Sequence, residues 1–128
     1  MGPAAKARVL LVEDNRAISR LISVVLSTAG FAVDTADNGN RALAAIRASR
    51  PDLVLLDLEL PDTDGFHVLE SIRRDKTGSA LRVIAFTSHT EHDVLEEVNR
   101  AGFDGYISKP IVPDEFVAKI ETFLTVGE

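Results

Sequence analysis

Leu53-Val54-Leu55-Leu56-Asp57 is a run of four apolar residues that ends on an aspartate. A short unbroken apolar run is typical of a strand in a parallel sheet, where helices cover both faces. Val9-Leu10-Leu11-Val12 is a second such run, and Glu13 and Asp14 follow it directly. The two runs therefore predict two fully buried strands, each with acidic residues at its carboxyl end.

Segments with apolar residues at helical spacing alternate with the strands along the whole chain. The strands are expected at residues 9–12, 31–36, 53–56, 82–86 and 105–108. Such alternation requires right-handed crossovers and a mostly parallel sheet with helices on both faces. We therefore predict an α/β fold of the flavodoxin-like type, a (βα)5 three-layer sandwich whose five-stranded parallel sheet has the order 2-1-3-4-5.

Capping residues place the ends of the last two helices. Thr90 with Asp93 resembles a capping pair ahead of the fourth helix, and Gly102 is expected to end that helix. Pro113 suits the first turn of the fifth helix. The domain is predicted at residues 8–125, with a flexible lead-in at 1–7 and a tail at 126–128.

Length and composition are those of one globular domain. The chain has 128 residues, 45% of them hydrophobic, and no cysteine, which excludes a disulfide scaffold and cysteine catalysis. No apolar run is long enough to span a membrane, and the N-terminus lacks the apolar core of a signal peptide, so the cytoplasm is the expected location. The net charge of −6 argues against nonspecific binding to nucleic acid.

Polar residues gather where the predicted strands end. Glu13 and Asp14 follow the first strand, Asp57 the third, Thr87 the fourth and Lys109 the fifth. Ligands of such sheets bind at this edge, and three carboxylates there repel one another unless a cation such as Mg²⁺ offsets them. Lys109 starts about 10 Å from Asp57 by strand spacing, and its stem is expected to bring the ammonium partway back. Together these groups describe a phosphoryl-transfer site.

Four sequence strings resemble the receiver domain of two-component response regulators, over about residues 7–125. They are Val9-Leu10-Leu11-Val12-Glu13-Asp14-Asn15, Leu55-Leu56-Asp57-Leu58 with Pro61 and Asp64-Gly65, Phe86-Thr87-Ser88, and Tyr106-Ile107-Ser108-Lys109-Pro110. The resemblance implies a phospho-acceptor switch, in which a histidine kinase or a histidine phosphotransfer protein donates a phosphoryl group to Asp57. Such a protein is not an enzyme, since it catalyses only its own phosphorylation and dephosphorylation.

The resemblance also implies the metal ligands. Asp14 and the carboxylate of Asp57 bind Mg²⁺ (or Mn²⁺) directly, Glu13 acts directly or through water, and the backbone carbonyl of Glu59 completes the protein ligands. Lys109 pairs with a phosphoryl oxygen.

The same resemblance implies a switch. Thr87 donates its hydroxyl to the phosphoryl group, and the ring of Tyr106 turns inward as Thr87 moves. The Lys109–Pro110 peptide matches one that is often cis in the family. A downstream effector protein is expected to read the face formed by the fourth helix, the strand at 105–108 and the fifth helix, in a monomer or a weak phosphorylation-dependent dimer.

Three other readings remain open. A degenerate receiver acts as an interaction module without phosphorylation, although the intact acidic set counts against it. A small Mg²⁺-dependent aspartyl phosphotransferase of the haloacid-dehalogenase type requires a second aspartate two residues after the nucleophile, where this chain has Glu59. A flavodoxin needs a phosphate loop after the first strand, where Glu13 and Asp14 repel phosphate.

The histidines and the C-terminal residues are not expected to form a functional site. His67, His89 and His92 do not form a metal set and are expected to be solvated. The few residues after Leu124 leave no room for an output domain, so we expect a stand-alone receiver or one excised from a longer regulator. No direct contact with nucleic acid or membrane is predicted.

Overall fold

The predicted five-stranded parallel sheet is confirmed. The computed structural model describes residues 6–75 and 80–125, except for the side chain of Lys6. Its strands are β1 (Lys6–Val12), β2 (Phe31–Ala36), β3 (Leu53–Asp57), β4 (Arg82–Thr87) and β5 (Gly105–Ser108). They pair in parallel in the order β2-β1-β3-β4-β5, so the two apolar runs lie side by side, with Val12 opposite Leu56.

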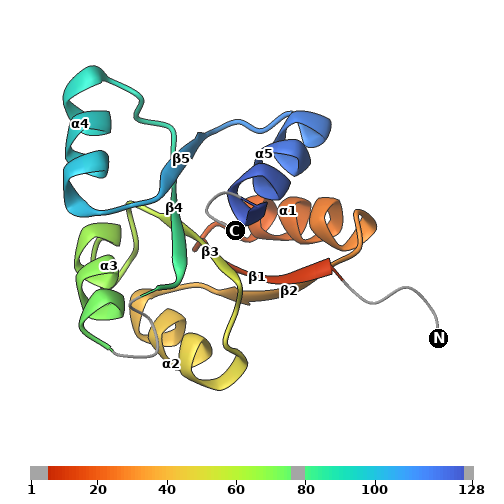
Figure 1. Ribbon diagram of the computed structural model, residues 1–128, viewed down its shortest axis with the longest axis horizontal. Helices are drawn as coiled ribbons and strands as arrows, with labels where there is room; N and C mark the ends of the chain where they lie inside the picture. The colour runs from red at the N-terminus through yellow and green to blue at the C-terminus, as the bar shows by residue number, and fades with distance from the viewer. Residues whose placement is uncertain (1–5, 76–79, 126–128) are drawn as a thin grey trace.

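In the described part of the chain, five helices cover the two faces of this sheet (Figure 1). They are α1 (Arg16–Thr28), α2 (Gly39–Ser49), α3 (Gly65–Arg74), α4 (His92–Ala101) and α5 (Pro113–Thr125). One core cluster lies between the sheet and α1 with α5, and the other lies between the sheet and α2, α3 and α4. All residues of β3 are buried, because a strand covered on both faces exposes neither set of side chains.

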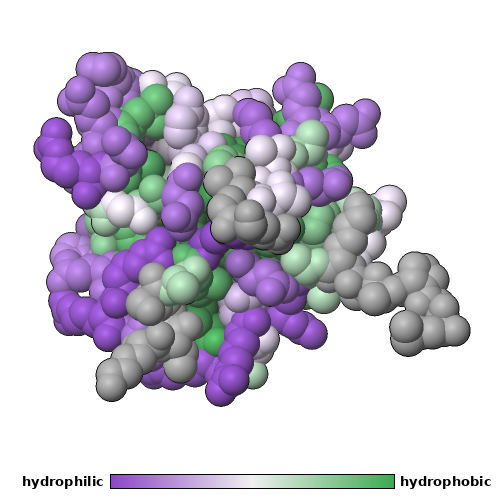
Figure 2. All heavy atoms as spheres, in the orientation of Figure 1, coloured by the Kyte–Doolittle hydropathy of each residue, from purple (hydrophilic) through white to green (hydrophobic). Residues whose placement is uncertain are grey.

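The surface complements this core. Figure 2 shows hydrophilic side chains over the outer sides of α3 and α4, whereas apolar atoms are seen mainly between elements. Among the described residues, no helix is both long enough and apolar enough to cross a bilayer.

Local signals explain most of the element ends. Asn15 and Asn38 cap α1 and α2 by accepting backbone hydrogen bonds, and Gly102 ends α4 at a φ of 102°. The Lys109–Pro110 peptide bond is cis, as the resemblance implies.

The predicted capping pair of α4 is wrong. The helix begins at His92, its N-cap is Glu91, and the side chain of Glu91 makes no capping hydrogen bond. Because the helix starts later than expected, Thr90 lies outside the capping position. Asp93 lies within the first turn, where it accepts a hydrogen bond from the amide of Val94.

The chain ends differ slightly from the predicted boundaries. Strand β1 begins at Lys6, so it includes the last two residues of the predicted lead-in at 1–7. Residues 1–5 of that lead-in and the predicted tail at 126–128 lie outside the described residues.

Candidate functional site

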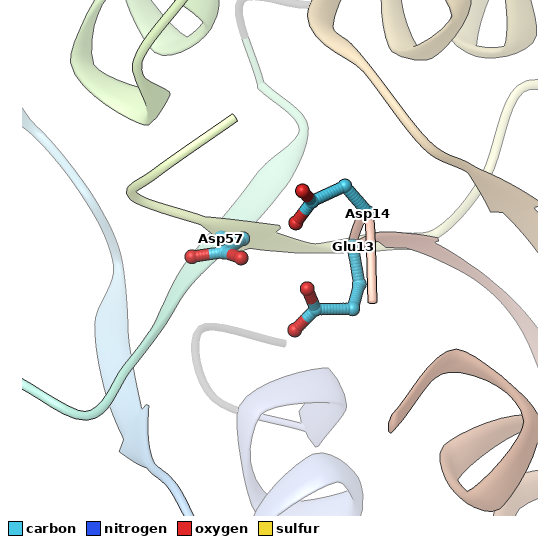
Figure 3. Close-up of side chains that lie close together, drawn as sticks. All are labelled: Glu13, Asp14 and Asp57. Atoms are coloured by element: carbon cyan, nitrogen blue, oxygen red, sulfur yellow. The ribbon is translucent and has the colours of Figure 1, made fainter. Parts of the chain in front are cut away.

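Three carboxylates meet at the carboxyl edge of the sheet. Glu13 and Asp14 directly follow β1, and Asp57 is the last residue of β3, the neighbouring strand. One carboxylate oxygen from each lies within 4.8 Å of the others (Figure 3). The structure therefore brings together the acidic residues that the strand ends pointed to.

Burial and hydrogen bonds differ among these carboxylates. The exposed fraction is 3% for Glu13 and 6% for Asp57, whereas Asp14 is exposed. Glu13 accepts a hydrogen bond from the amide of Asn15 at 3.1 Å, and Asp57 accepts one from the amide of Glu59 at 3.0 Å. Each buried carboxylate thus has one oxygen held by backbone and one oxygen left for another partner.

Lys109 supplies that partner. Its Nζ lies 2.6 Å from Oε1 of Glu13 and 3.3 Å from Oδ2 of Asp57. The sequence predicts that the ammonium comes partway back toward Asp57, whereas in the structure it reaches the carboxylate. Burial favours the neutral amine, but the hydrogen bond with Glu13 and the charge of Asp57 outweigh it, and the pKa of Lys109 lies above 10.5. Lys109 is therefore an ammonium ion at neutral pH.

The cluster fits a divalent cation. One ammonium offsets only one of three carboxylate charges, and the remaining charge is carried by hard oxygen donors that Mg²⁺ prefers. Asp14, the exposed member, leaves the cluster open to solvent on one side. The residues present therefore match a site that holds a hydrated divalent ion.

Thr87 and Lys109 share the cavity with these acids. The cavity has a volume of about 330 Å³, and its lining includes Glu13, Asp14, Asp57, Glu59, Thr87, His89 and Lys109. Thr87 is 2% exposed, its hydroxyl oxygen accepts from the amide of His89 at 2.9 Å, and its carbonyl accepts from the amide of Lys109. The hydroxyl is thus held at the cavity wall.

Tyr106 lies away from the cavity. It is on β5, with its Cα opposite Ala85 of β4, and it is 43% exposed. Side chains alternate across a strand, so Tyr106 and Thr87 belong to the face of the sheet that α4 covers.

The structure adds a pair that the sequence analysis missed. Nε2 of His89 lies 2.9 Å from Oε1 of Glu59, and both residues line the cavity. His89 is an exposed loop residue, as the sequence predicts, and its contact with Glu59 is the part that was not predicted. Glu59 follows Asp57 by two positions, and His89 follows Thr87 by two, at the ends of the adjacent strands β3 and β4. That common offset places both residues near the same edge of the sheet, whereas the contact between their side chains depends on the paths of the two loops.

The loop after β3 is fastened to α2 by Asp62. Its carboxylate accepts hydrogen bonds from the amides of Gly39 at 2.8 Å and Asn40 at 3.1 Å. These amides open α2, where a negative charge is favoured by the helix dipole. The hydrogen bond from Gly39 has the largest effect and that from Asn40 a smaller one, and together they hold the pKa of Asp62 below 3.8.

We expect the replacement Asp62→Asn to lower stability slightly at neutral pH. An amide oxygen is a weaker acceptor than a carboxylate, and Asp62 is exposed, which screens the effect. Because the pKa of Asp62 is lower in the folded state, its contribution to the free energy of unfolding is complete above pH 3.8. That contribution is lost as the pH falls through the folded-state pKa. Urea unfolding followed by circular dichroism from pH 2 to 7 measures this.

The replacement Asp114→Asn provides the control, since Asp114 is an exposed residue in the first turn of α5. The curves of parent and Asp62→Asn proteins should converge in acid, whereas a constant gap between them at every pH would contradict this account.

Comparisons with known proteins identify relatives of this chain. Residues 9–121 match the family model of the response regulator receiver domain. The DNA-binding response regulator MtrA of Mycolicibacterium smegmatis is 34% identical over 123 residues, which are 96% of this chain and 53% of the relative. The chain thus spans about half the length of the curated relatives it matches.

Solved structures agree as well. The receiver domain of sensor histidine kinase PA1611 from Pseudomonas aeruginosa PAO1, which has a magnesium ion coordinated in its active site cleft, superposes with a TM-score of 0.86 at 28% identity. The match covers 94% of this chain and 98% of that one. The phosphorylated cyanobacterial phytochrome response regulator RcpA superposes with a TM-score of 0.82 at 34% identity, over 97% of both chains. This chain therefore belongs to the receiver domain family of two-component response regulators.

Proposed function

We propose that this chain is a phospho-acceptor switch whose acceptor is Asp57. The observation that carries the proposal is the pairing of this buried carboxylate with Lys109 beside two further carboxylates. A nucleophile, a fixed cation and a site for a divalent ion are the groups that phosphoryl transfer requires.

The proposed donor is a phosphohistidine of a histidine kinase or a histidine phosphotransfer protein. A carboxylate oxygen of Asp57 attacks phosphorus, the P–N bond breaks, and its electron pair returns to the imidazole. The product is an acyl phosphate on Asp57, which water later hydrolyses to phosphate and the free carboxylate. During both steps Lys109 offsets the charge on the phosphoryl oxygens.

Asp14, Asp57 and Glu13 are the proposed ligands of Mg²⁺ or Mn²⁺, together with the backbone carbonyl of Glu59. Their support is the acidic cluster and the similarity to PA1611, whose structure holds magnesium. When bound, the ion offsets negative charge on the carboxylates and on the incoming phosphoryl group. Glu13 and Asp57 keep their backbone hydrogen bonds from Asn15 and Glu59, which fix their orientation.

Phosphorylation is proposed to act on the face formed by α4, β5 and α5. The new charge attracts the hydroxyl of Thr87, the last residue of β4, whose oxygen accepts a hydrogen bond from the amide of His89 in the loop before α4. Tyr106, half-exposed on the same face of the sheet, moves inward as Thr87 shifts. An effector protein is the proposed reader of the changed face.

The names of the relatives bear on whether the protein contacts nucleic acid. MtrA is called a DNA-binding regulator, and this chain matches about half of it. The expectation of no contact with nucleic acid is therefore proposed for this receiver domain alone. The cytoplasmic location and the monomeric or weakly dimeric state stay predictions.

The competing readings lose support. The degenerate receiver would not need the complete set of Asp14, Asp57, Thr87 and Lys109, all of which line one cavity. The relatives are named as regulators rather than enzymes, and Glu59 faces His89 rather than the acceptor, which weakens the phosphotransferase reading.

Intact mass spectrometry after incubation with Mg²⁺ and acetyl phosphate tests the proposal. We expect one phosphoryl group on the parent, none after chelation of the metal and none on the Asp57→Asn variant. Asp52→Asn is the matched control, since Asp52 lies just before β3 on the opposite edge of the sheet and should leave the adduct unchanged. If neither acetyl phosphate nor beryllofluoride modifies or binds the parent, the degenerate interaction module becomes the better reading.

A further inference from the structure

The ammonium group of Lys109 has a third neighbour besides its two carboxylates. Its Nζ lies over the ring of Phe86, 4.7 Å from the ring centroid. Phe86 is 1% exposed and the side chain of Lys109 is 18% exposed, so little water remains between them. A cation over an aromatic face is attracted by the ring quadrupole, most strongly where water is excluded.

The position of Phe86 in the sheet explains this contact. Its Cα is opposite Asp57 on one side and opposite Ile107 on the other. Because Lys109 follows β5 and must reach β3, its stem has to pass over β4. Phe86 belongs to the core cluster that lies beneath α1 and α5, and its ring is therefore the surface on which the stem rests.

The chemistry of the ring matters as much as its shape. An aliphatic side chain at this position would support the stem but would leave the half-buried ammonium without attraction on that side. Burial opposes the charged form of Lys109, whereas the ring face, like the carboxylates on the other side, favours it. Phe116 of α5 packs against Phe86, with the two ring centroids 6.5 Å apart, and restricts the position of the ring.

We propose that Phe86 is a positioning residue for phosphorylation: the face of its ring holds the Lys109 ammonium at the carboxylate cluster. The inference rests on the proposed function of Asp57. It differs from a packing role, because it makes the reaction depend on the electron density of the ring. When a phosphoryl oxygen replaces a carboxylate as partner of Lys109, the ring contact remains.

Fluorinated phenylalanines test this dependence in the full chain. Replacement of Phe86 by 4-fluoro-, 3,5-difluoro- and 3,4,5-trifluorophenylalanine, through suppression of a stop codon, weakens the ring face stepwise with little change in volume. The rate of phosphorylation by acetyl phosphate with Mg²⁺ should fall stepwise, about threefold to tenfold across the series. A thermal midpoint measured for each variant verifies that the fold is kept.

The same substitutions at Phe103 are the control. Phe103 is 6% exposed, packs edge-to-face on Phe66 and belongs to the core cluster on the other face of the sheet. Its series should leave the rate unchanged. Equal rates across the Phe86 series would overturn the proposal.

A second readout separates this inference from the proposed function. Nitrogen-15 relaxation of the Lys109 ammonium reports how firmly it is held and needs no phosphoryl group. Its order parameter should fall along the Phe86 series and stay constant along the Phe103 series. If the parent accepts no phosphoryl group but the order parameter falls, the proposed function fails and the positioning by Phe86 stands. A constant order parameter overturns the positioning role itself.

Discussion

Replacement of Lys109 by methionine should slow the phosphorylation of Asp57 by roughly 100-fold or more, because a fixed donor to the developing oxyanion typically contributes that much. Methionine keeps most of the length of the stem and removes the charge. The cation beside the acceptor is then lost, since Nζ lies 3.3 Å from Asp57. Stopped reactions with acetyl phosphate, quantified by intact mass, measure the rate.

The same replacement should also destabilise the protein. Glu13 and Asp57, whose side chains are 1% and 9% exposed, would face each other without the ammonium between them. The cost of leaving buried charges unpaired is about 3 kcal/mol. Saturating Mg²⁺ should recover part of that loss, and should therefore raise the melting temperature of the variant more than that of the parent.

The pH dependence of the parent has a definite sign. Because the pKa of Lys109 is higher in the folded state, its contribution to the free energy of unfolding is complete below pH 10.5. That contribution is lost as the pH rises through the folded-state pKa. The Lys109→Met variant should lack this alkaline decline. Lys119→Met, at an exposed position of α5, removes a lysine elsewhere and should change neither the rate nor the stability. A rate for Lys109→Met within threefold of the parent would contradict the role given to the ammonium.

The sheet is predictable because its signal is local. Two strands are buried on both faces, at Leu53 to Leu56 and at Val9 to Val12. Each of them is therefore an unbroken apolar run that can be recognised without knowledge of the rest of the fold. The alternation with helices predicts a parallel sheet, and five such units in 128 residues match the flavodoxin-like order, which places Asp57 beside Glu13 and Asp14. The acidic cluster is thus a consequence of topology, which the sequence pattern contains.

Features that depend on loop paths and side-chain rotamers are not predictable in this way. The pair formed by Glu59 and His89 requires that two loops from different strands turn toward each other. The anchor at Asp62 joins residues that are 23 positions apart. The predicted start of α4 is misplaced because Thr90 has the right side chain for a cap but the wrong position. Such contacts are decided by tertiary geometry, which short-range patterns do not encode.

Replacement of Gly65 by alanine should disturb both the stability and the site. Gly65 opens α3 and its amide donates to the carbonyl of Leu58 at 2.9 Å, which closes the loop after β3. A Cβ at this position would lie 2.7 Å from the carbonyl oxygen of Asp57 and 2.9 Å from Cα of Leu58. Both contacts are with backbone, so a change of side-chain rotamer cannot relieve them.

The expected loss follows from these contacts. Overpacking of this kind costs about 3 kcal/mol, and the better helix propensity of alanine returns at most about 1 kcal/mol. A net loss near 2 kcal/mol corresponds to a fall in Tm of about 8 °C, which thermal unfolding followed by circular dichroism can measure. The backbone that must shift carries the acceptor carboxylate itself, so phosphorylation should slow at least about tenfold.

The variant Gly102→Ala separates the two effects. Gly102 has a φ of 102°, and a Cβ added there would meet no described atom within 4 Å, so alanine introduces backbone strain of about 1–2 kcal/mol without a clash. It ends α4 at the edge of the sheet opposite the carboxylates. Gly102→Ala should therefore lower Tm and leave the phosphorylation rate unchanged. If Gly65→Ala slows phosphorylation no more than Gly102→Ala does, the reaction does not depend on the close approach of α3 to Asp57.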